Sequence, residues 1–182
     1  MTARVLGDGD VERLITIGEA IEVMRESFLQ HAAGTLQAPA RIGAEMDLGH
    51  LVFTAGAIAR PPGRIGFRVY DLAQLGVTGR TELVAVFSTL EGSLEGLVVG
   101  EVLGPLRTGA IGGLAIDVLS RPSAKRLGLI GTGAQARTQV AAACAVRASS
   151  TPSSALIWRA STGRMSSLTS AFPSLWLPPH RR

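Results

Sequence analysis

The amino-acid sequence predicts a mixed fold, with an α+β region over residues 1–120 and the opening strand and helix of an α/β domain over residues 121–147. Three observations support this prediction. An amphipathic helix pattern precedes a series of short strand-like segments. An apolar stretch then runs through a glycine-rich turn into an alanine-rich helix pattern. After Arg147 the composition changes and these patterns end, so the α/β domain is predicted to be incomplete.

The first long helix is predicted from a capping signal and an apolar stripe, after a short helical turn over residues 8–14. Thr16 and Glu19 have the T-x-x-E spacing of a capping box, in which each side chain bonds the other residue's backbone N–H. Four apolar residues follow on one helical face: Ile17, Ile21, Met24 and Phe28. Gly34 suits the left-handed position that ends a helix.

Residues 40–100 are predicted to form a mostly antiparallel sheet, with the first long helix covering one face. The expected strands are rich in β-branched and apolar residues, and they cover residues 41–46, 51–58, 65–70, 82–90 and 93–99. Turn-forming residues separate them, including Asp47-Leu48-Gly49 and Pro61-Pro62-Gly63. Glu91-Gly92 is expected to be a two-residue hairpin turn. Residues 100–104 end the sheet.

A second long helix is expected from Pro105, which suits a first helical turn, to the break at Arg121-Pro122. Its interior contains Gly109, Gly112 and Gly113. Each glycine costs about 1 kcal/mol relative to alanine in a helix. Three of them so close together indicate that another backbone or a ligand approaches this face.

The stretch L-G-L-I-G-T-G-A-Q-A-R begins with a short buried strand over residues 127–130. Gly131, Gly133 and Ala136 then follow at the spacing G-x-G-x-x-A, which is typical of dinucleotide-binding turns. The first glycine permits a sharp turn, and the second lets a pyrophosphate approach the backbone. The third small residue allows close helix–strand packing, while the helix N-terminus faces the phosphates. An ordinary strand–turn–helix is the alternative explanation.

Composition excludes several classes of protein. The sequence pI near 10.5 suggests nucleic acid, but residues 1–147 carry 14 Lys and Arg against 14 Asp and Glu. The net charge of +4 comes from four arginines after residue 147, so we do not expect a nucleic-acid surface. No apolar run reaches the ~18 residues of a membrane span, and no secretory signal pattern is present. A single cysteine, Cys144, excludes an internal disulfide and favours the cytoplasm.

Residues 148–182 differ from the rest of the chain. They hold nine of the 14 serines, four of the nine prolines and no Asp or Glu. Residues 155–158 have the pattern of one strand. Two explanations remain open: a disordered Ser/Pro-rich tail, or an out-of-frame segment that makes the chain a fragment.

The segment L-G-P-L-R-T-G-A-I-G-G-L-A-I-D-V-L-S-R-P-S-A-K-R-L-G-L-I-G-T-G-A-Q-A-R-T-Q, residues 103–139, resembles the ornithine cyclodeaminase/mu-crystallin family. It joins an L-R-T helix to a strand and a glycine turn at the family's spacing. Shorter matches lie upstream, in A-P-A-R (38–41), L-V-F-T-A-G-A (51–57) and G-F-R-V-Y-D (66–71). The resemblance therefore runs over residues 1–147 and not through the tail.

The resemblance implies an α+β substrate-binding and dimerisation domain, followed by the start of a Rossmann-type domain that binds NAD or NADP. It implies a homodimer that acts on a small amino acid or imino acid. Activities in the family include ammonia-lyase cyclodeamination of ornithine, alanine dehydrogenation and imine reduction by hydride transfer. Some members are non-catalytic binding proteins.

Three arginines match substrate-site positions of the family. Arg107 stands at the carboxylate-binding arginine of the L-R-T helix, and Arg41 at a second substrate-site arginine. A guanidinium offers a carboxylate a bidentate fork. Arg68 stands where many members have a lysine. This departure weakens the case for cyclodeamination, because arginine stays charged while a buried lysine can exchange protons.

The cofactor would contact the phosphate turn and one residue of the L-R-T helix. The residues assigned to it by the resemblance are Thr108, Gly131, Thr132, Gly133, Ala134, Gln135 and Ala136. Packing within the helix is the alternative role of Thr108, and helix capping that of Gln135. Lys125 and the histidines His31, His50 and His180 are expected on the surface, with no metal-binding spacing. Cys144, among alanines, is expected to pack.

Two acidic residues that the family uses are missing. The family's catalytic aspartate follows the glycine turn, and a ribose-binding acid is expected about 20 residues after the fingerprint. This chain has no Asp or Glu after Asp117. We therefore expect a cyclodeaminase-like protein that is inactive as this fragment. The alternative is a non-catalytic ligand-binding or dimerisation module of the mu-crystallin type.

Overall fold

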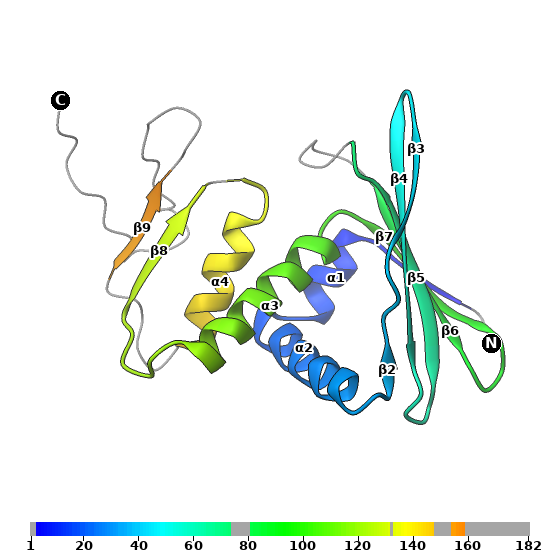
Figure 1. Ribbon diagram of the computed structural model, residues 1–182, viewed down its shortest axis with the longest axis horizontal. Coiled ribbons are helices and arrows are strands. Elements are labelled where there is room, and N and C mark those ends of the chain that lie inside the picture. The colour runs from blue at the N-terminus through cyan, green and yellow to red at the C-terminus, as the bar shows by residue number, and fades with distance from the viewer. Residues whose placement is uncertain (1–2, 74–80, 132, 148–153, 159–182) are drawn as a thin grey trace. The chain divides into compact units, whose positions relative to one another are not determined.

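A computed structural model of the protein describes residues 3–73, 81–131, 133–147 and 154–158 (Figure 1). The chain divides into two compact units. Unit 1 comprises Met1–Thr16 and Val23–Gly104, and unit 2 comprises Ile17–Glu22 and Pro105–Arg182. Two helices, α2 (Ile17–Ala32) and α3 (Leu103–Leu119), contribute residues to both units. The predicted domain boundary at residue 120 stays a prediction.

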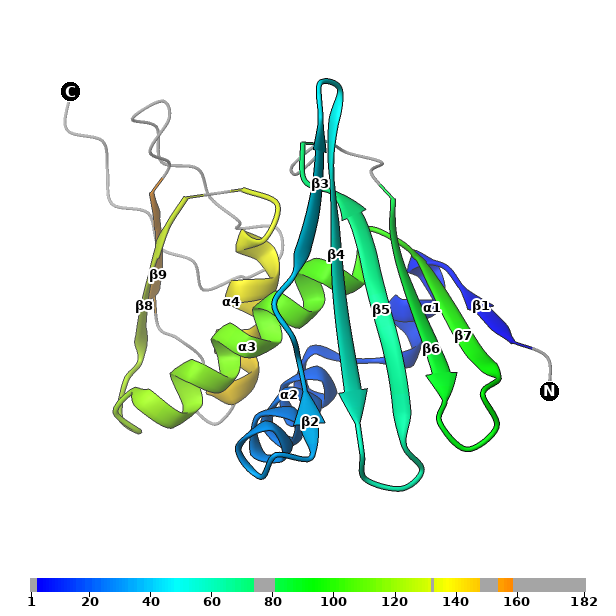
Figure 2. The same cartoon turned by 45° about the vertical axis from the view of Figure 1, so that its right-hand side comes forward.

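Unit 1 is built on a seven-stranded sheet in the order β1-β7-β6-β5-β4-β2, with β3 also paired to β4 (Figure 2). All its strand pairs are antiparallel except β1 with β7. The strands are β1 (Arg4–Leu6), β2 (Leu36–Gln37), β3 (Ile42–Met46), β4 (Gly49–Ile58), β5 (Arg64–Asp71), β6 (Glu82–Ser88) and β7 (Leu94–Gly100). The predicted, mostly antiparallel sheet is confirmed.

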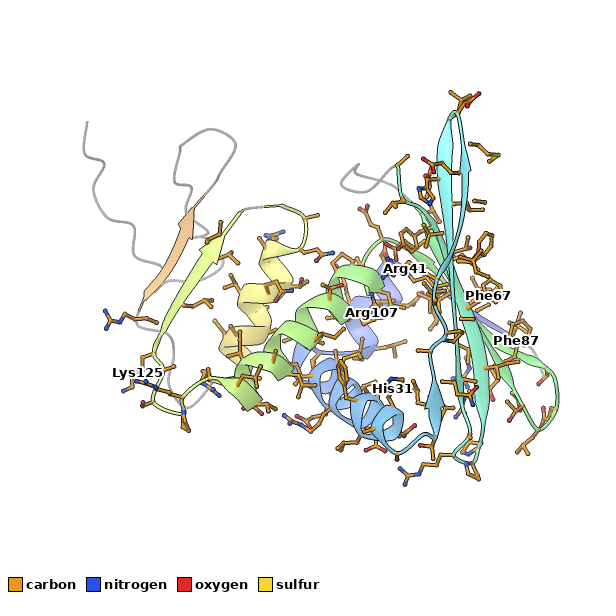
Figure 3. All side chains as sticks on the ribbon, viewed as in Figure 1. His31, Arg41, Phe67, Phe87, Arg107 and Lys125 are labelled. Atoms are coloured by element: carbon orange, nitrogen blue, oxygen red, sulfur yellow. The ribbon has the colours of Figure 1, made fainter. Side chains whose placement is uncertain are left out.

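The sheet has two distinct faces. Helix α1 (Asp8–Leu14) and the part of α2 from Val23 onward lie on one side, which we call the inner face (Figure 1). Val52 and Tyr70 are paired across β4 and β5 on this face, and both are buried. The opposite face, the outer face, carries Phe67 and Phe87, which point away from α1 (Figure 3).

Helix α2 ends as its sequence predicts. Gly34 adopts a left-handed conformation with φ of 73°. Its N–H donates to the carbonyl of His31, and the N–H of Thr35 donates to that of Gln30. These two bonds form a Schellman motif, so glycine is required here because a Cβ would be strained. The capping box of Thr16 and Glu19 stays a prediction.

Two details of the sheet differ from the prediction. Strands β1 and β2 were not expected, because both are very short and pair with segments distant in sequence. The hairpin turn between β6 and β7 is longer than the predicted Glu91-Gly92. The N–H of Ser88 donates to the carbonyl of Ser93, and Ser88 Oγ accepts from the N–H groups of Leu90 and Glu91. The serine side chain thereby stabilises a wider turn over residues 89–92.

The start of α3 is held by a carboxylate from the other end of unit 1. Asp8 Oδ1 accepts two hydrogen bonds of 2.9 Å, one from the N–H of Glu101 and one from the N–H of Val102. Gly100 lies against this carboxylate, and a Cβ there would overlap it. A carboxylate near the N-terminus of a helix stabilises free N–H groups and the helix dipole.

Unit 2 contains the predicted strand–turn–helix. Strand β8 (Arg126–Ile130) leads through the glycine turn into α4 (Ala136–Val146). Strand β9 (Ser154–Trp158), which covers the predicted strand at 155–158, pairs in parallel with β8. The parallel pair joined by α4 is the opening β-α-β unit of a Rossmann-type fold, as predicted. The rest of the predicted tail lies outside the described residues.

The three glycines of α3 face neighbouring segments of unit 2. A Cβ at Gly109 would lie 2.6 Å from Thr138 Cβ and 2.7 Å from its backbone C and O atoms. A Cβ at Gly112 would overlap the Gln139 side chain, and one at Gly113 would lie 2.8 Å from Ala142 Cβ. Helix α4 therefore contacts the backbone of α3, which confirms the expected close approach. Within the described part of the chain, no helix has the length and hydropathy needed to cross a membrane.

We expect Gly109→Ala to destabilise the fold, because the new methyl group would meet the backbone of α4 rather than a side chain that can turn away. Overpacking usually costs about 1–3 kcal/mol, and alanine's helix propensity returns about 1. Because the clash is with backbone atoms, we expect the upper end of this range, a net loss of about 2 kcal/mol. Urea denaturation followed by circular dichroism measures this change.

The matched control is Gly128→Ala in β8, where a Cβ would meet nothing within 4 Å in the part of the chain that the structure describes. It should leave the free energy of unfolding within about 0.5 kcal/mol of the wild type. Equal stability of the two variants would contradict the close packing of α3 and α4.

Candidate functional site

The three predicted substrate arginines are divided between the two units. Arg41 and Arg68 belong to unit 1, and Arg107 belongs to unit 2. Each is therefore described within its own unit.

Arg41 lies in the segment that connects β2 to β3, directly before Ile42 (Figure 3). Its side chain is exposed, and it makes no hydrogen bond or ion pair with any residue that the structure describes. An exposed guanidinium without such a partner has its N–H donors available for an anion.

Arg68 has a different environment on the inner face of β5. Its Nε donates to Glu82 Oε2 at 2.8 Å, and its Nη2 lies 2.6 Å from the same oxygen. Its Cζ lies 4.2 Å from the centre of the Tyr70 ring, within the range of a cation–π contact. Glu82 is only 4% exposed, and the Arg68 side chain 19%. The guanidinium is thus held by an ion pair and an aromatic ring.

Glu82 was not identified from the sequence as part of this site. It begins β6, while Arg68 and Tyr70 lie on the neighbouring strand β5. Its carboxylate also adjoins the first turn of α3, where a Cβ on Gly104 would lie 2.7 Å from Oε2. The sequence shows only that an acidic residue precedes the apolar run L-V-A-V-F. Without the strand register, this does not indicate that Glu82 pairs with Arg68.

Arg107 and Thr108 lie on the second turn of α3, with Arg107 exposed and Thr108 half-buried. The backbone carbonyl of Thr108 accepts a hydrogen bond from Gln139 Nε2 on α4, at 3.2 Å. This bond links the L-R-T segment to the helix that follows the glycine turn. It engages the Thr108 backbone, and the predicted contact of its side chain with a cofactor stays a prediction.

The glycine turn has the geometry that its sequence predicts. Gly131 has φ of 94°, a left-handed conformation that favours glycine. A Cβ at Gly131 or Gly133 would meet none of the described residues within 4 Å, so this part of the chain leaves the turn open above the backbone. Ala134 and Gln135 are exposed, and Ala136 begins α4. Thr132 lies outside the described residues.

Gln135 precedes α4 at the N-cap position, but its side chain makes no capping hydrogen bond. The alternative capping role of Gln135 is therefore wrong: its backbone lies already in the helical region, with φ of −86° and ψ of −10°. The turn lies at the carboxyl end of β8, where open α/β sheets bind their ligands.

The remaining candidate residues have ordinary structural environments. His31 and Lys125 are exposed as expected (Figure 3), whereas His50 is half-buried with its ring against Gly43. His180 lies outside the described residues. Partial burial raises the pKa of the Cys144 thiol, which disfavours the reactive thiolate. Among the described residues, no three His, Cys, Asp or Glu side chains gather as metal ligands.

Comparisons with known proteins agree with this architecture. The sequence profile of the Ornithine cyclodeaminase/mu-crystallin family matches residues 1–151. An alanine dehydrogenase of Archaeoglobus fulgidus is 29% identical over 151 residues, covering 78% of this chain and 44% of that protein.

Two solved structures of relatives also match. A Δ1-pyrroline-2-carboxylate reductase of Thermococcus litoralis, in complex with NADH and L-proline, has a TM-score of 0.74 and 26% identity, covering 87% of this chain and 50% of that one. A lysine cyclodeaminase has a TM-score of 0.70 and 28% identity, covering 88% of this chain and 50% of that one.

The chain spans about half the length of these relatives. The family profile covers most of the chain, including both the sheet of unit 1 and the glycine turn of unit 2. The chain belongs to the ornithine cyclodeaminase/mu-crystallin family.

Proposed function

We propose that this chain is an ornithine cyclodeaminase-like protein that binds NAD or NADP together with a small amino acid or imino acid. The open glycine turn at the carboxyl end of β8 carries this proposal. Gly131 has the backbone conformation that the turn requires, while no atom of the described residues occupies the space above Gly133. Nothing in the packing of the described residues requires glycine at position 133, so a ligand is the better reason for it.

The turn has the chemistry that a dinucleotide needs. A pyrophosphate is an anion, and the N-terminus of α4 offers N–H groups and a positive dipole. Gly131, Thr132, Gly133, Ala134, Gln135 and Ala136 would hold the pyrophosphate, with Thr108 as a further contact. A cofactor held there would supply hydride transfer to or from the substrate. The Thermococcus litoralis relative was solved with NADH.

Arg41 and Arg68 in unit 1 and Arg107 in unit 2 are assigned to substrate binding by their positions in the family's motifs. A guanidinium binds a carboxylate through two parallel hydrogen bonds. Arg68, at the family's lysine position, lies on the inner face of the same unit as Arg41. The Thermococcus litoralis structure contains L-proline, a ligand of the proposed class.

The reaction itself is proposed to be absent from this chain. The missing acid after Asp117 leaves the family's aspartate without a counterpart, so no carboxylate is assigned to proton transfer. Following absorbance at 340 nm with cyclic imines, with ornithine, and with pyruvate plus ammonia tests this. Clear turnover of NAD(P)H with any of them would contradict the proposed inactivity, and would place the protein among the lyases or oxidoreductases of its family.

The second candidate function is a non-catalytic dimerisation module, and the outer face of the sheet favours it. Leu51, Phe53, Ile65 and Phe67 are between 36% and 49% exposed, and strand alternation places all four on this face. Phe67 and Phe87 stack with ring centroids 6.4 Å apart. A hollow of about 360 Å³ adjoins them, lined in part by Ala55 and Ala57.

A second copy of this chain is the proposed occupant of the outer face. A contiguous apolar surface on a sheet is usually covered by a partner, and protruding phenylalanines beside a hollow lined by alanines can pack against their own copy. A homologous archaeal alanine dehydrogenase was solved as a dimer. The cytoplasmic location and the nature of residues 148–182 rest on the sequence alone and stay predictions.

We expect Gly133→Ala to weaken NADH binding by at least about tenfold, because its methyl group would occupy the space proposed for the pyrophosphate. The melting temperature should not fall, since a Cβ at this position meets no atom of the residues that the structure describes. Isothermal titration calorimetry with NADH measures the affinity. Gly128→Ala is the control, in equally open space on β8, and should bind NADH like the wild type. Unchanged affinity in Gly133→Ala would contradict the cofactor site.

We expect Phe67→Asp to convert a homodimer into monomers, because a carboxylate at the centre of the outer face would be buried without a partner. Light scattering coupled to gel filtration measures the mass. Leu14→Asp is the control: Leu14 is 67% exposed, on α1 and not on the outer face, and its substitution should leave the dimer intact. A monomeric wild type would contradict this interface. A dimer with no measurable NAD(P)H affinity would favour the non-catalytic module.

A further inference from the structure

The loop that joins α3 to β8 brings three cations to one hollow. They are Arg121, Lys125 and Arg126, and all three side chains are exposed (Figure 3 labels Lys125). Together with Ser123 and Ala124 they line a hollow of about 530 Å³. All five residues belong to unit 2. The hollow is therefore bordered by three positive charges and one hydroxyl group.

A tight turn in the backbone holds this arrangement. The N–H of Ala124 donates to the carbonyl of Arg121 at 2.9 Å, which closes a four-residue turn. Pro122 takes the second position of the turn, where its fixed φ favours this conformation. Lys125 follows the turn directly, and Arg126 begins β8. The cations are thus carried by a turn and a strand whose backbones are hydrogen-bonded.

The three cations have no acidic partner among the residues that the structure describes. None of their side chains makes a hydrogen bond or an ion pair there. The nearest preceding acid in the sequence, Asp117, forms an ion pair with Arg147 at 3.2 Å. No Asp or Glu follows Asp117 in the sequence. Like charges that stand together without a counter-charge create a positive potential, which attracts anions.

The end of α3 does not account for these cations. Positive side chains near the C-terminus of a helix stabilise its dipole and its free carbonyl groups. Arg147 already has this role, because its Nη2 donates to the carbonyl of Ile116 and to Ser120 Oγ. A helix end also carries only about half an elementary charge, far less than three cations. Most of the positive charge of the loop is therefore uncompensated.

The number of cations indicates the chemistry of a ligand. An exposed cation binds a single anion weakly, so a ligand must contact several of them at once. A triphosphate chain offers three linked phosphate groups, one for each cation. A guanidinium binds phosphate through two parallel hydrogen bonds, and a lysine ammonium binds it as a point charge. The hydroxyl of Ser123 adds a further hydrogen-bond donor.

This hollow is separate from the glycine turn. Strand β8 begins at Arg126 and ends at Ile130, which places these two residues about 13 Å apart at 3.3 Å per residue. The glycine turn follows Ile130, whereas the hollow lies at the amino end of the strand. A pyrophosphate at the glycine turn would therefore not contact the cations of the loop.

We propose that the three cations and the hydroxyl of Ser123 form a binding site for a triphosphate group, either free or as part of a nucleoside triphosphate. The cations neutralise the phosphate groups, and the hydroxyl donates to a phosphate oxygen. The site needs neither the cofactor nor the substrate of the proposed function.

The test follows the backbone amide signals of Ser123, Ala124 and Lys125 by nuclear magnetic resonance of the full chain. Sodium triphosphate is added at constant ionic strength, and we expect a saturable shift of these signals. Arg121→Gln, Lys125→Gln and Arg126→Gln each remove one cation from the hollow, so each should weaken binding at least about threefold. All three side chains are exposed, so the variants should fold like the wild type.

Arg137→Gln is the matched control, because it removes one exposed cation of unit 2 outside the hollow. It has the same net charge as Lys125→Gln and should bind triphosphate like the wild type. Lys125→Arg keeps the positive charge and should also retain binding. Titration with ATP separates the two sources of the group. Tighter binding of ATP identifies a nucleoside triphosphate as the ligand, and equal or weaker binding identifies the free chain.

Three results would overturn the proposal. The first is the absence of a saturable shift in the wild type. The second is a Lys125→Gln variant that binds triphosphate as tightly as Arg137→Gln. The third is a short single-stranded DNA that shifts the same signals at a lower concentration than triphosphate, which would indicate a nucleic-acid surface. NADH binding, measured by calorimetry on the same samples, tests the glycine turn separately.

Discussion

The absence of side chains along one face of α3 is the constraint on which unit 2 depends. Gly109 and Gly113 let the backbone and small side chains of α4 come within contact distance of the α3 backbone. The Thr108 carbonyl then accepts its bond from Gln139 at this contact. Helix α4 in turn fixes the exit of the glycine turn that follows β8. Three poor helix formers in a buried helix are therefore tolerated because they allow two helices to pack closely.

Features carried by local patterns were predictable from the sequence. The apolar stripe predicted α2, and Gly34 predicted where it ends. The strand-like segments and the turn residues between them predicted β3 to β7. The left-handed turn was predictable from Gly131, because the positive φ at this one position favours glycine. The clustered glycines of α3 also predicted a close neighbour, since their cost in helix stability needs a compensating contact.

Features that depend on distant pairings were not predictable. Strand β1 pairs with β7 across most of unit 1, and a three-residue strand has too few positions to show a period. The wider turn over residues 89–92 depends on the Ser88 hydroxyl, which accepts hydrogen bonds from the N–H groups of Leu90 and Glu91. These bonds favour the wider turn over a two-residue turn. Glu82 shows the same limit, because its importance comes from the register that sets it beside Arg68. Sequence patterns identified Arg68 as a candidate site residue, but its ion pair with Glu82 could be identified only from the structure.

The two glycines of the turn show how structural and functional constraints can be separated. Gly131 is explained by its backbone alone, since its φ of 94° disfavours any other residue whether or not a ligand binds. Gly133 does not adopt a positive φ, and none of the described residues lies within 4 Å of a Cβ there, so the described part of the chain does not require glycine at this position. Arg68 presents the opposite case, a residue at a ligand-binding position of the family whose charge is satisfied inside the protein. A glycine that the described part of the fold does not need therefore points to a ligand, whereas an arginine with an ion-pair partner has a structural role whether or not a ligand binds.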